Sequence, residues 1–283
     1  RFIGIVEVNR DEPGSSRLIT DQPAIEQAIM DFYSNLYKAR PTSSSDSDLK
    51  GFMGDSGYKG FHNIAKKKTP QTVYQKMNEE ISSDEVLAAI THGKHGVAPG
   101  ISGFSREFYQ SFSTDLIGFI MKYIQFTEQV GILSENQRIG VITLLPKGQK
   151  DKKTLKNWRP ITLLSTLYKI ISGIIGNRFK KFLPNIVGLD QKGFVDGRYM
   201  GEVTRLLYDT IHDAYMTKGK KGVIMSIDFE KAFDSVSFSF IEKVIETAGF
   251  PNRLLKWVRI LLKVFQSHIN HAGNILKLIK LGR

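Results

Sequence analysis

The sequence predicts an α+β fold, in which short apolar strands and amphipathic helices follow one another without regular alternation. Strand-like apolar runs occur at residues 1–10, 141–145 and 223–227. Helical spacing of apolar residues covers much of the chain between them, and alternating residues on both sides of Gly273 and Asn274 predict a hairpin. A doubly wound parallel sheet needs strands and helices in strict alternation, so the pattern disfavours that class.

The first 40 residues are expected to form one strand and one helix. Residues 1–10 alternate as a single strand, and Asp21 followed by Pro23 is typical of a helix start. The helix places its apolar residues on one face: Ile25, Ala28, Ile29, Phe32, Tyr33, Leu36 and Tyr37. Residues 41–80 are rich in Ser, Asp, Gly and Lys, so we expect a flexible linker there.

A folded body is predicted to begin near residue 81. Ser82 and Glu85 have the spacing of a capping box for a helix through Ile90. A lysine-rich turn after Pro146 ends the strand at 141–145. Further helices are expected at 105–129, 165–182, 203–217, 237–248 and 252–265, and hairpin strands at 267–272 and 275–281.

The chain is basic, and its positive charge is concentrated. Its 283 residues include 40 Lys and Arg against 28 Asp and Glu, a net charge of +12, and residues 141–205 alone hold 13 basic and 4 acidic residues, a net +9. Aromatic residues are interleaved there: Trp158, Tyr168, Phe179, Phe182, Phe194 and Tyr199. Because basic side chains release phosphate counterions and rings stack on bases, the segment favours a nucleic acid as partner. A solvated basic face, or adhesion to anionic lipid, is the alternative.

The chain contains no cysteine, which excludes disulfides and cysteine-ligated zinc sites. His92 with His95, and His268 with His271, lack a third ligand of a zinc site, so we interpret them as surface polar residues. No apolar run reaches the roughly 20 residues of a membrane-spanning helix, and the first residues lack a signal-peptide pattern. We therefore expect a soluble protein without a membrane partner.

Asp228 is the strongest candidate for a metal ligand. A turn at Gly219–Gly222 precedes the apolar residues 223–227, and Asp228 follows at the carboxyl end of the expected strand. A carboxylate at the end of a buried strand is costly to desolvate unless a cation or hydrogen bonds compensate it, and Mg²⁺ prefers such ligands. An Asp that only caps the following turn is the alternative.

Several short motifs carry a family resemblance. They lie at 157–164, 168–170, 176–179, 191–194 with 197–198, and 227–234. Their identity, order and spacing resemble the reverse transcriptases of LINE-type non-LTR retrotransposons, and the resemblance runs from about residue 81 to the C-terminus. Ala98, Pro99 and Gly100 resemble that family's N-terminal extension motif, except that Ile101 and Ser102 stand where the family has Pro and Asp.

The resemblance implies a right-hand polymerase architecture, with residues 81–140 as the N-terminal extension, 141–222 as the fingers and 223–283 as a partial palm. It implies an RNA-directed DNA polymerase that copies element RNA into DNA by two-metal nucleotidyl transfer, with Mg²⁺ as cofactor. The implied partners are an RNA template, a DNA primer or target, and dNTPs. The implied location is intracellular, in the nucleus with a cytoplasmic ribonucleoprotein phase.

The resemblance also assigns roles around residue 228. Asp228 would be the first catalytic, metal-binding Asp, and Lys231 and Ala232 would lie under the triphosphate and contribute backbone N–H groups. Phe233 would be the steric gate, a ring that occupies the space of a ribose 2′-hydroxyl and so favours dNTPs. A core aromatic residue after a turn is the alternative for Phe233.

Other roles fall on the basic segment. Arg159 would clamp the triphosphate through a bidentate guanidinium, unless it packs on Trp158. Lys152 and Lys153 would assist, although lysines in a basic turn are also well explained as solvated. The remaining nucleic-acid-binding residues are expected to line the template path: Gln191, Gly193, Phe194, Arg198, Lys180 and Lys181. Glycine in this path permits close backbone approach.

The predicted catalytic centre is incomplete. Two further metal-binding Asp residues of the family come from a Tyr-x-Asp-Asp hairpin, and this sequence contains no Asp-Asp pair. Glu230 and Asp234 would diverge from Asp228 on a strand or turn, so we interpret them as polar neighbours. Gly282 and Arg283 resemble the beginning of the family's next motif. We therefore expect a fragment that is inactive by itself.

Two other interpretations stay open at this point. One is a catalytically dead nucleic-acid-binding module derived from such an element. The other is a reverse transcriptase of another lineage, such as a group II intron maturase. Sequence after Arg283 with the missing motifs would favour the enzyme, and an endonuclease domain before Arg1 would favour the LINE type.

Overall fold

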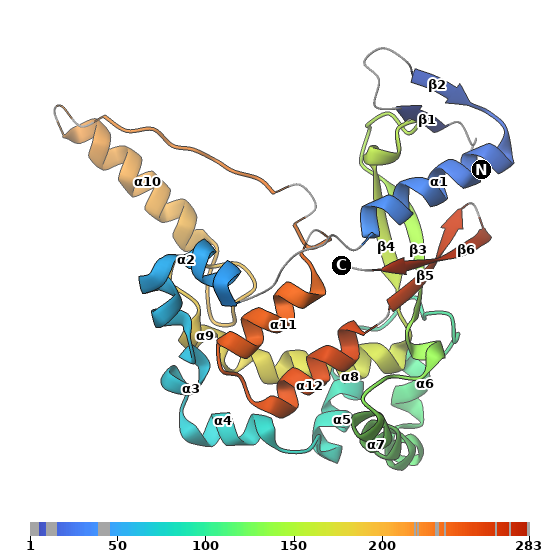
Figure 1. Ribbon diagram of the computed structural model, residues 1–283, viewed down its shortest axis with the longest axis horizontal. Coiled ribbons are helices and arrows are strands. Elements are labelled where there is room, and N and C mark those ends of the chain that lie inside the picture. The colour runs from blue at the N-terminus through green and yellow to red at the C-terminus, as the bar shows by residue number, and fades with distance from the viewer. Residues whose placement is uncertain are drawn as a thin grey trace.

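A computed structural model describes residues 6–9, 16–38, 46–217, 219, 221–229, 232–234, 236–263, 265–271 and 273–281. A four-stranded sheet with helix α1 (Gln22–Tyr37) stands beside a larger helical body, and α10 (Gly201–Met216) projects away from both (Figure 1). This mixture of helices and sheet confirms the predicted α+β class at the level of helix and strand content.

The strands are β1 (Val6–Asn9), β2 (Ser16–Ile19), β3 (Ile139–Pro146), β4 (Trp158–Leu163), β5 (Phe265–His271) and β6 (Asn274–Leu281). The other helices are α2 (Asp46–Phe61), α3 (Ile64–Lys68), α4 (Gln71–Asn78), α5 (Ser83–Thr91), α6 (Arg106–Ser111), α7 (Ser113–Val130), α8 (Thr166–Lys180), α9 (Leu183–Ile186), α11 (Phe238–Thr247) and α12 (Asn252–Leu262). The expected helices after residue 81 and the hairpin at Gly273 are confirmed, each within a few residues at its ends.

The larger sheet has the order β4-β3-β5-β6. β3 runs antiparallel to β4 and parallel to β5, and β5 and β6 form the hairpin. A Cβ on Gly140 would lie 2.7 Å from Thr162 Cγ2 and 2.9 Å from Ser267 Oγ, so close packing of the central strand requires glycine there. The sheet thus joins strands from both sides of residue 222, and the division into fingers and palm at that residue stays a prediction.

Helix α1 covers one face of this sheet. The side chain of Asp21 caps the helix by accepting a hydrogen bond from the Ala24 N–H at 3.1 Å. The apolar stripe predicted from the sequence is buried at Ile25, Ile29, Tyr33 and Tyr37, against sheet residues that include Ile142, Trp158 and Ile279. Residues 22–37 thus belong to the same core as the sheet. The single strand expected over 1–10 is half of a two-stranded sheet, since β1 pairs with β2, which the sequence did not predict.

The interpretation of His271 as a surface polar residue is wrong, because its side chain is buried. Alternation along β5 places Ser267, Ile269 and His271 on the buried face, where the His271 Nδ1 lies 3.5 Å from the Gln22 amide nitrogen. His268, on the other face, is half-buried, with its Nδ1 2.9 Å from the Leu276 carbonyl oxygen. The side chains of His268 and His271 therefore point to opposite faces of the sheet.

The expected linker at 41–80 is corrected over residues 46–80, which hold α2, α3 and α4. Two backbone bonds tie this segment to the end of α11, from the Asn63 N–H to the Thr247 carbonyl and from the Ala65 N–H to the Ala248 carbonyl, both 2.9 Å. Ala65 and Met77 are buried in the core of the helical body. Composition misled here because a few apolar residues suffice to dock short helices on a neighbour, and tertiary packing overrides weak local preference.

Helix α8 is the centre of the helical body. Its Ile170, Ile171, Ile174 and Ile175 are buried, as the helical spacing predicts, and they share a core with residues of α5, α7 and α12 that include Trp257. Ser165 caps the helix by accepting a hydrogen bond from the Tyr168 N–H at 3.2 Å.

A buried guanidinium holds α8 to α5. All five N–H donors of Arg178 are used: Nε and one Nη donate to the Glu85 carboxylate at 2.8 and 2.7 Å, and the others donate to the carbonyls of Met77, Glu79 and Glu80. Glu85 also completes the predicted capping box, which is confirmed. Burial raises the pKa of Glu85, but the hydrogen bonds from Arg178 and the Ser82 N–H outweigh it, so its pKa is lowered overall.

Glu85→Gln is expected to destabilise the protein by about 3 kcal/mol at pH 7, because the Arg178 charge would stay buried without its counter-ion. Urea unfolding measures this difference. A lowered folded-state pKa means that the carboxylate stabilises the fold above its ordinary pKa of 4.5, and that this contribution is lost as the pH falls through the lower folded value. The gap between wild type and variant should therefore narrow below pH 4.5.

Asp55→Asn is the matched control, since it breaks the exposed Lys50–Asp55 ion pair of 3.1 Å and should leave the unfolding midpoint nearly unchanged. Equal losses in the two variants, or a gap for Glu85→Gln that does not depend on pH, would contradict a stabilising buried pair.

Candidate functional site

The turn between β3 and β4 displays a group of lysines, and the motif at 157–164 holds it in place. The Trp158 indole N–H donates to the Lys152 carbonyl at 2.9 Å, and the Asn157 amide donates to the Asp151 carbonyl at 2.8 Å. The Asp151 carboxylate accepts from the Lys153 N–H at 3.0 Å. Trp158 itself is buried in the sheet core. The side chains of Lys152 and Lys153 are thus exposed, on a turn whose backbone is held by hydrogen bonds from Trp158 and Asn157.

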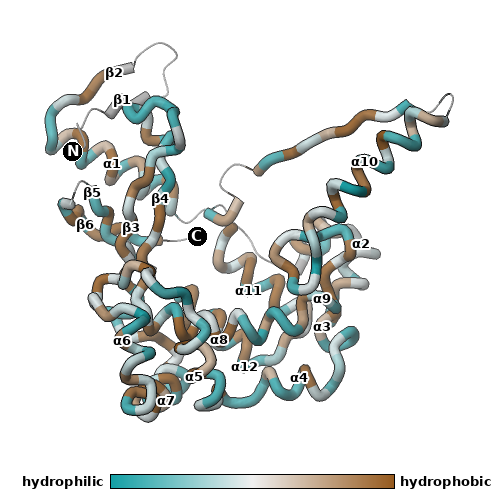
Figure 2. Tube along the Cα trace, turned by 180° about the vertical axis from the view of Figure 1, so that it is seen from behind, coloured by the Kyte–Doolittle hydropathy of each residue, from teal (hydrophilic) through white to brown (hydrophobic). Residues whose placement is uncertain are grey.

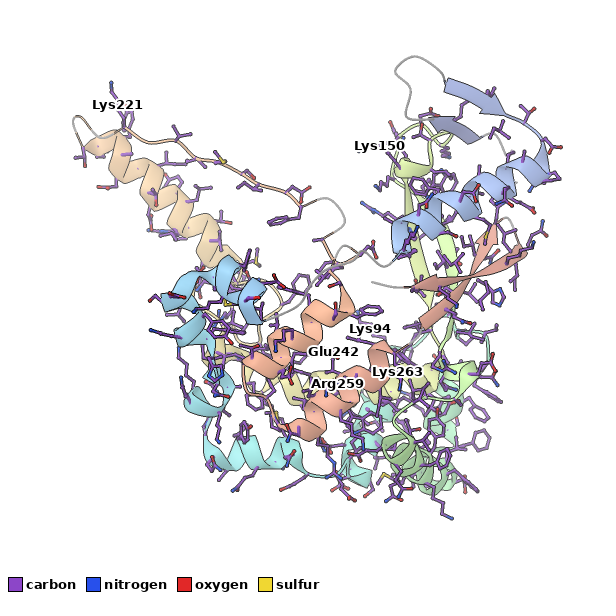
Figure 3. The ribbon with its side chains drawn as sticks, viewed as in Figure 1. Lys94, Lys150, Lys221, Glu242, Arg259 and Lys263 are labelled. Carbon is purple, nitrogen blue, oxygen red and sulfur yellow. The ribbon has the colours of Figure 1, made fainter. Side chains whose placement is uncertain are left out.

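Arg159 lies on the opposite face of β4 from Trp158. It is exposed and stands opposite Leu145 in the register of the hairpin. Successive side chains on a strand point to opposite faces, so the arginine is free of the tryptophan ring that the alternative assigned to it. Clamping of a triphosphate by Arg159 stays a prediction, and its exposure beside the lysine turn is compatible with it. Figure 3 labels Lys150 at the tip of this hairpin.

The end of α9 and the loop at 187–198 fold around Arg198. Its guanidinium donates to the carbonyls of Pro184 at 3.1 Å, Val187 at 2.8 Å, Gln191 at 2.6 Å and Gly188. Template contact by Arg198 stays a prediction, but the structure gives the residue a second role, which is to shape the loop.

Gln191 and Gly193, two residues of the predicted template path, lie in the same loop. The Gln191 side-chain amide donates to the Gly193 carbonyl at 2.9 Å. A Cβ on Gly193 would meet nothing closer than 3.7 Å, so packing within the chain does not require glycine there. Template contacts of both residues stay predictions.

The structure brings together two residues that the sequence places 39 positions apart. The rings of Phe194 and Phe233 make an edge-to-face contact, with centroids 5.9 Å apart and an interplanar angle of 90°. Both side chains are otherwise exposed, and Ala232 beside Phe233 is exposed too. The core-aromatic alternative for Phe233 is therefore wrong. Lys231 lies outside the described residues.

The strand expected at 223–227 is not formed. Residues 221–229 follow a drawn-out course (Figure 1) and pair with no described strand, and Val223, Met225, Ile227 and Phe229 are exposed. Figure 2 shows this hydrophobic stretch leading back from the outer end of α10, where Figure 3 labels Lys221. An apolar segment becomes a buried strand only beside partner strands, and the described residues supply none here.

Asp228 is consequently exposed rather than at the edge of a buried sheet. Among the described residues, no three His, Asp or Glu side chains lie close enough together to hold a metal ion. Glu230 lies outside the described residues, and Asp234 is half-buried close enough to Tyr33 and Tyr37 to raise their pKa values, adding to a larger effect of burial. The described residues therefore do not form a two-metal site around Asp228.

Lys180 and Lys181 occupy a different part of the molecule. They are exposed at the C-terminal end of α8, and Lys181 lines a cavity of about 220 Å³ that also includes Glu85 and Arg178. Figure 1 shows this end of α8 leading to α9, away from the β3–β4 turn. The basic segment predicted as one path is thus divided between two places.

The N-terminal extension motif docks on the start of α8. A Cβ on Gly100 would lie 2.5 Å from the Leu164 carbonyl carbon and the Ser165 nitrogen, so the backbone approach requires glycine. The Thr166 hydroxyl donates to the Phe104 carbonyl at 2.6 Å. The Gly103 N–H donates to the Gly100 carbonyl at 3.0 Å, so the turn forms although Ile101 and Ser102 replace the family's residues. Sequence spacing could not predict this contact between two motifs.

Residues 147–278 match the family model described as reverse transcriptase (RNA-dependent DNA polymerase). The chain carries a reverse transcriptase domain. The matched range contains every predicted site residue, from Lys152 to Phe233, and most of the β5–β6 hairpin.

Two proteins of transposable elements are similar to this chain. The Transposon TX1 uncharacterized 149 kDa protein of Xenopus laevis is 28% identical over 241 residues, which cover 85% of this chain and 17% of that protein. The Retrovirus-related Pol polyprotein from type-1 retrotransposable element R2 of Popillia japonica is 34% identical over 109 residues, 38% of this chain and 14% of that protein. Both elements are of the non-LTR, LINE type, so the resemblance inferred from the motifs is confirmed.

The chain spans less than a fifth of the length of these relatives. Its similarity to the TX1 protein extends well beyond the family match and so includes sequence outside residues 147–278. None of the helices in the described ranges has the length and apolar character that would let it cross a membrane.

We expect this chain to bind single-stranded RNA with an affinity that falls steeply with salt, because exposed lysines neutralise phosphates. Lys152→Gln with Lys153→Gln should lower the slope of log affinity against log salt by about 1.4, and Lys180→Gln with Lys181→Gln should do so only if the nucleic acid reaches both places. Fluorescence anisotropy with a labelled oligonucleotide at about 50 and 200 mM salt measures the slopes.

Lys66→Gln with Lys67→Gln on α3 is the matched control, with the same loss of charge outside the basic segment. Binding that hardly changes with salt, or that survives neutralisation of all four lysines, would show that the segment is a solvated face.

Proposed function

We propose that this chain supplies the fingers and the beginning of the palm of an RNA-directed DNA polymerase from a non-LTR retrotransposon. The observation that carries the proposal is the contact between Phe194 and Phe233, since it brings a template-path motif of the family against its nucleotide-site motif. The lysine turn held by Trp158 and the docking of Gly100 on Ser165 support it. The motif of Phe194 thus contacts the motif of Phe233, and the motif of Gly100 contacts the end of the motif at 157–164. The two motifs of each pair are far apart in sequence.

The proposed roles of the site residues follow from which of their side chains are exposed. Arg159 would bind phosphate oxygens bidentately, with Lys152 and Lys153 adding positive charge around a triphosphate. Phe233 would lie beside the sugar, and its exposed ring leaves room for a nucleotide to approach. Ala232 and Lys231 would present backbone N–H groups to the phosphates.

The family generally uses divalent metals, which would supply two-metal activation of the primer hydroxyl and of the triphosphate. The described residues do not fit a pair of metal ions, because no two further carboxylates among them lie near Asp228. We propose that these carboxylates belong to sequence outside the 283 residues. The proposed role of the 283 residues themselves is to bind and orient the template and the nucleotide.

The proposed partners are an RNA template, a DNA primer or target, and dNTPs, and the proposed location is the nucleus with a cytoplasmic ribonucleoprotein phase. A nucleic-acid-binding module without polymerase activity is not favoured, since none of the described features is specific to it. The intron-type alternative is also less well supported, because the similar proteins belong to LINE-type elements.

The 283-residue chain by itself is expected to show no primer extension with Mg²⁺ and dNTPs, because one of three expected metal-binding carboxylates is present. The measurement is extension of a labelled DNA primer on an RNA template. A longer protein that includes the remaining carboxylates should extend the primer, and Asp228→Ala in it should abolish extension. Incorporation by the 283 residues alone, lost on Asp228→Ala, would overturn this expectation.

In the longer protein, Phe233→Ala or Phe233→Val should admit rNTPs, because the shorter side chain frees the space beside C2′. Arg159→Ala should reduce the use of dNTPs and rNTPs alike, since a phosphate clamp does not contact the sugar. Single-nucleotide incorporation kinetics with both substrates separates the two effects. If Phe233→Ala abolishes activity without admitting rNTPs, the steric-gate assignment is wrong.

A further inference from the structure

Two aromatic rings that solvent would otherwise surround are in contact with each other. Phe194 is 91% exposed and Phe233 is 81% exposed, and their centroids lie 5.9 Å apart at right angles. Edge-to-face pairs are favourable because the positive edge of one ring meets the negative face of the other. The contact therefore restricts two side chains that the core leaves unrestrained.

The backbone of Phe194 is in an unusual conformation. Its φ is +62°, in the left-handed region that bulky residues avoid. Asn63 is the other non-glycine residue with a positive φ in the described ranges, and asparagine adopts that region far more readily. Gly193 directly precedes Phe194, yet the unfavourable conformation falls on the phenylalanine. Such outliers persist where surrounding structure enforces them, and they cluster at functional sites.

The surrounding loop supplies that enforcement. Arg198 ties four carbonyls between Pro184 and Gln191, and the Arg198 N–H donates to the Val195 carbonyl at 3.3 Å. Lys192 forms an ion pair with Glu202 at the start of α10. Val195, next to Phe194, is buried. The loop is thus anchored on both sides of a ring that it turns outward.

The partner ring belongs to a different segment of the chain. Phe233 lies in a short turn at 232–234 after the unpaired residues 221–229. Residues 230, 231 and 235 lie outside the described ranges. Among the ring contacts of the described residues, the one made by Phe233 is with Phe194. The anchored loop of Phe194 therefore supports the Phe233 ring from a different segment of the chain.

We infer that Phe194 is a positioning residue for nucleotide sugar selection, whose ring sets the orientation of Phe233. The inference rests on the proposed function, in which Phe233 excludes the ribose 2′-hydroxyl. A ring can exclude a hydroxyl only when its tilt is fixed, because a freely rotating phenylalanine would swing out of the space. The edge of one ring against the face of the other supplies that restraint from a different segment of the chain.

The contact itself is tested in the 283-residue chain without any activity. 4-Fluorophenylalanine is placed at position 233 and observed by ¹⁹F NMR. Phe194→Leu should shift and sharpen the resonance, because it removes the ring current and the restraint, while Phe194→Tyr should keep both. Phe119→Leu, at another exposed phenylalanine on α7, is the control and should leave the resonance unchanged. A resonance that Phe194→Leu does not move would overturn the inference.

The consequence is tested in the longer, active protein. Phe194→Leu should lower the ratio of kcat/KM for dNTP over rNTP about 3- to 10-fold, the size expected from loss of one aromatic pair. Phe194→Tyr keeps an aromatic ring and should leave the ratio as it is in the unaltered protein. In a Phe233→Ala background, Phe194→Leu should change the ratio no further. A template-binding role alone would instead lower kcat/KM for both nucleotides equally, and that result would overturn the inference.

Failure of the proposed function gives a different result. An unaltered longer protein that incorporates no nucleotide would contradict the polymerase assignment, and this inference with it. An active protein whose discrimination ignores Phe194 would contradict this inference alone.

Discussion

The parallel pairing of β3 with β5 is the constraint on which the rest of the structure depends. It joins Ile139 to Gln266 and Thr143 to Asn270, so the chain must leave the sheet after β4 and return to it more than a hundred residues later. Parallel strands need a crossover connection, and here the crossover contains α8 to α12. Because α1 covers the same sheet, both ends of the described chain are tied to one core.

The basic side chains are of two kinds: some hold the fold together through internal bonds, and others are exposed where a ligand could reach them. Of the basic residues in 141–205, Arg178, Arg198 and Lys192 are occupied by carboxylates or carbonyls of the chain. Lys152 and Arg159 are instead exposed on or next to a turn that internal hydrogen bonds hold. Net charge over a segment therefore overstates what a polyanion can reach, and the exposed subset is the better guide to binding.

Local patterns predicted the elements well, and long-range contacts account for what they missed. The stripe of α1, the capping box at Ser82 and the hairpin at Gly273 depend on neighbours in sequence, and all three form. The helices at 46–78 depend on docking to α9, α11 and α12, which composition does not encode. The strand expected at 223–227 depends on partner strands, so its apolar pattern was insufficient by itself.

The candidate site shows the same division. Motif spacing selected Phe194 and Phe233 separately, but it contained no sign that their rings touch or that Phe194 takes a left-handed conformation. The exposure of Arg159 follows from the two-residue period of a strand once Trp158 is known to be buried. A period is readable from sequence, whereas a contact between distant loops requires the fold.

The extended residues 221–229 also have a consequence for handling the protein. They combine high β-propensity with unpaired backbone, and Asp228 is their one charged side chain apart from Lys221. Segments of this kind recruit identical segments from other molecules into intermolecular sheets, and a single acidic residue is a weak barrier to that process. The carboxylate that marks the candidate catalytic position is thus also the acidic charge that opposes such pairing within residues 221–229.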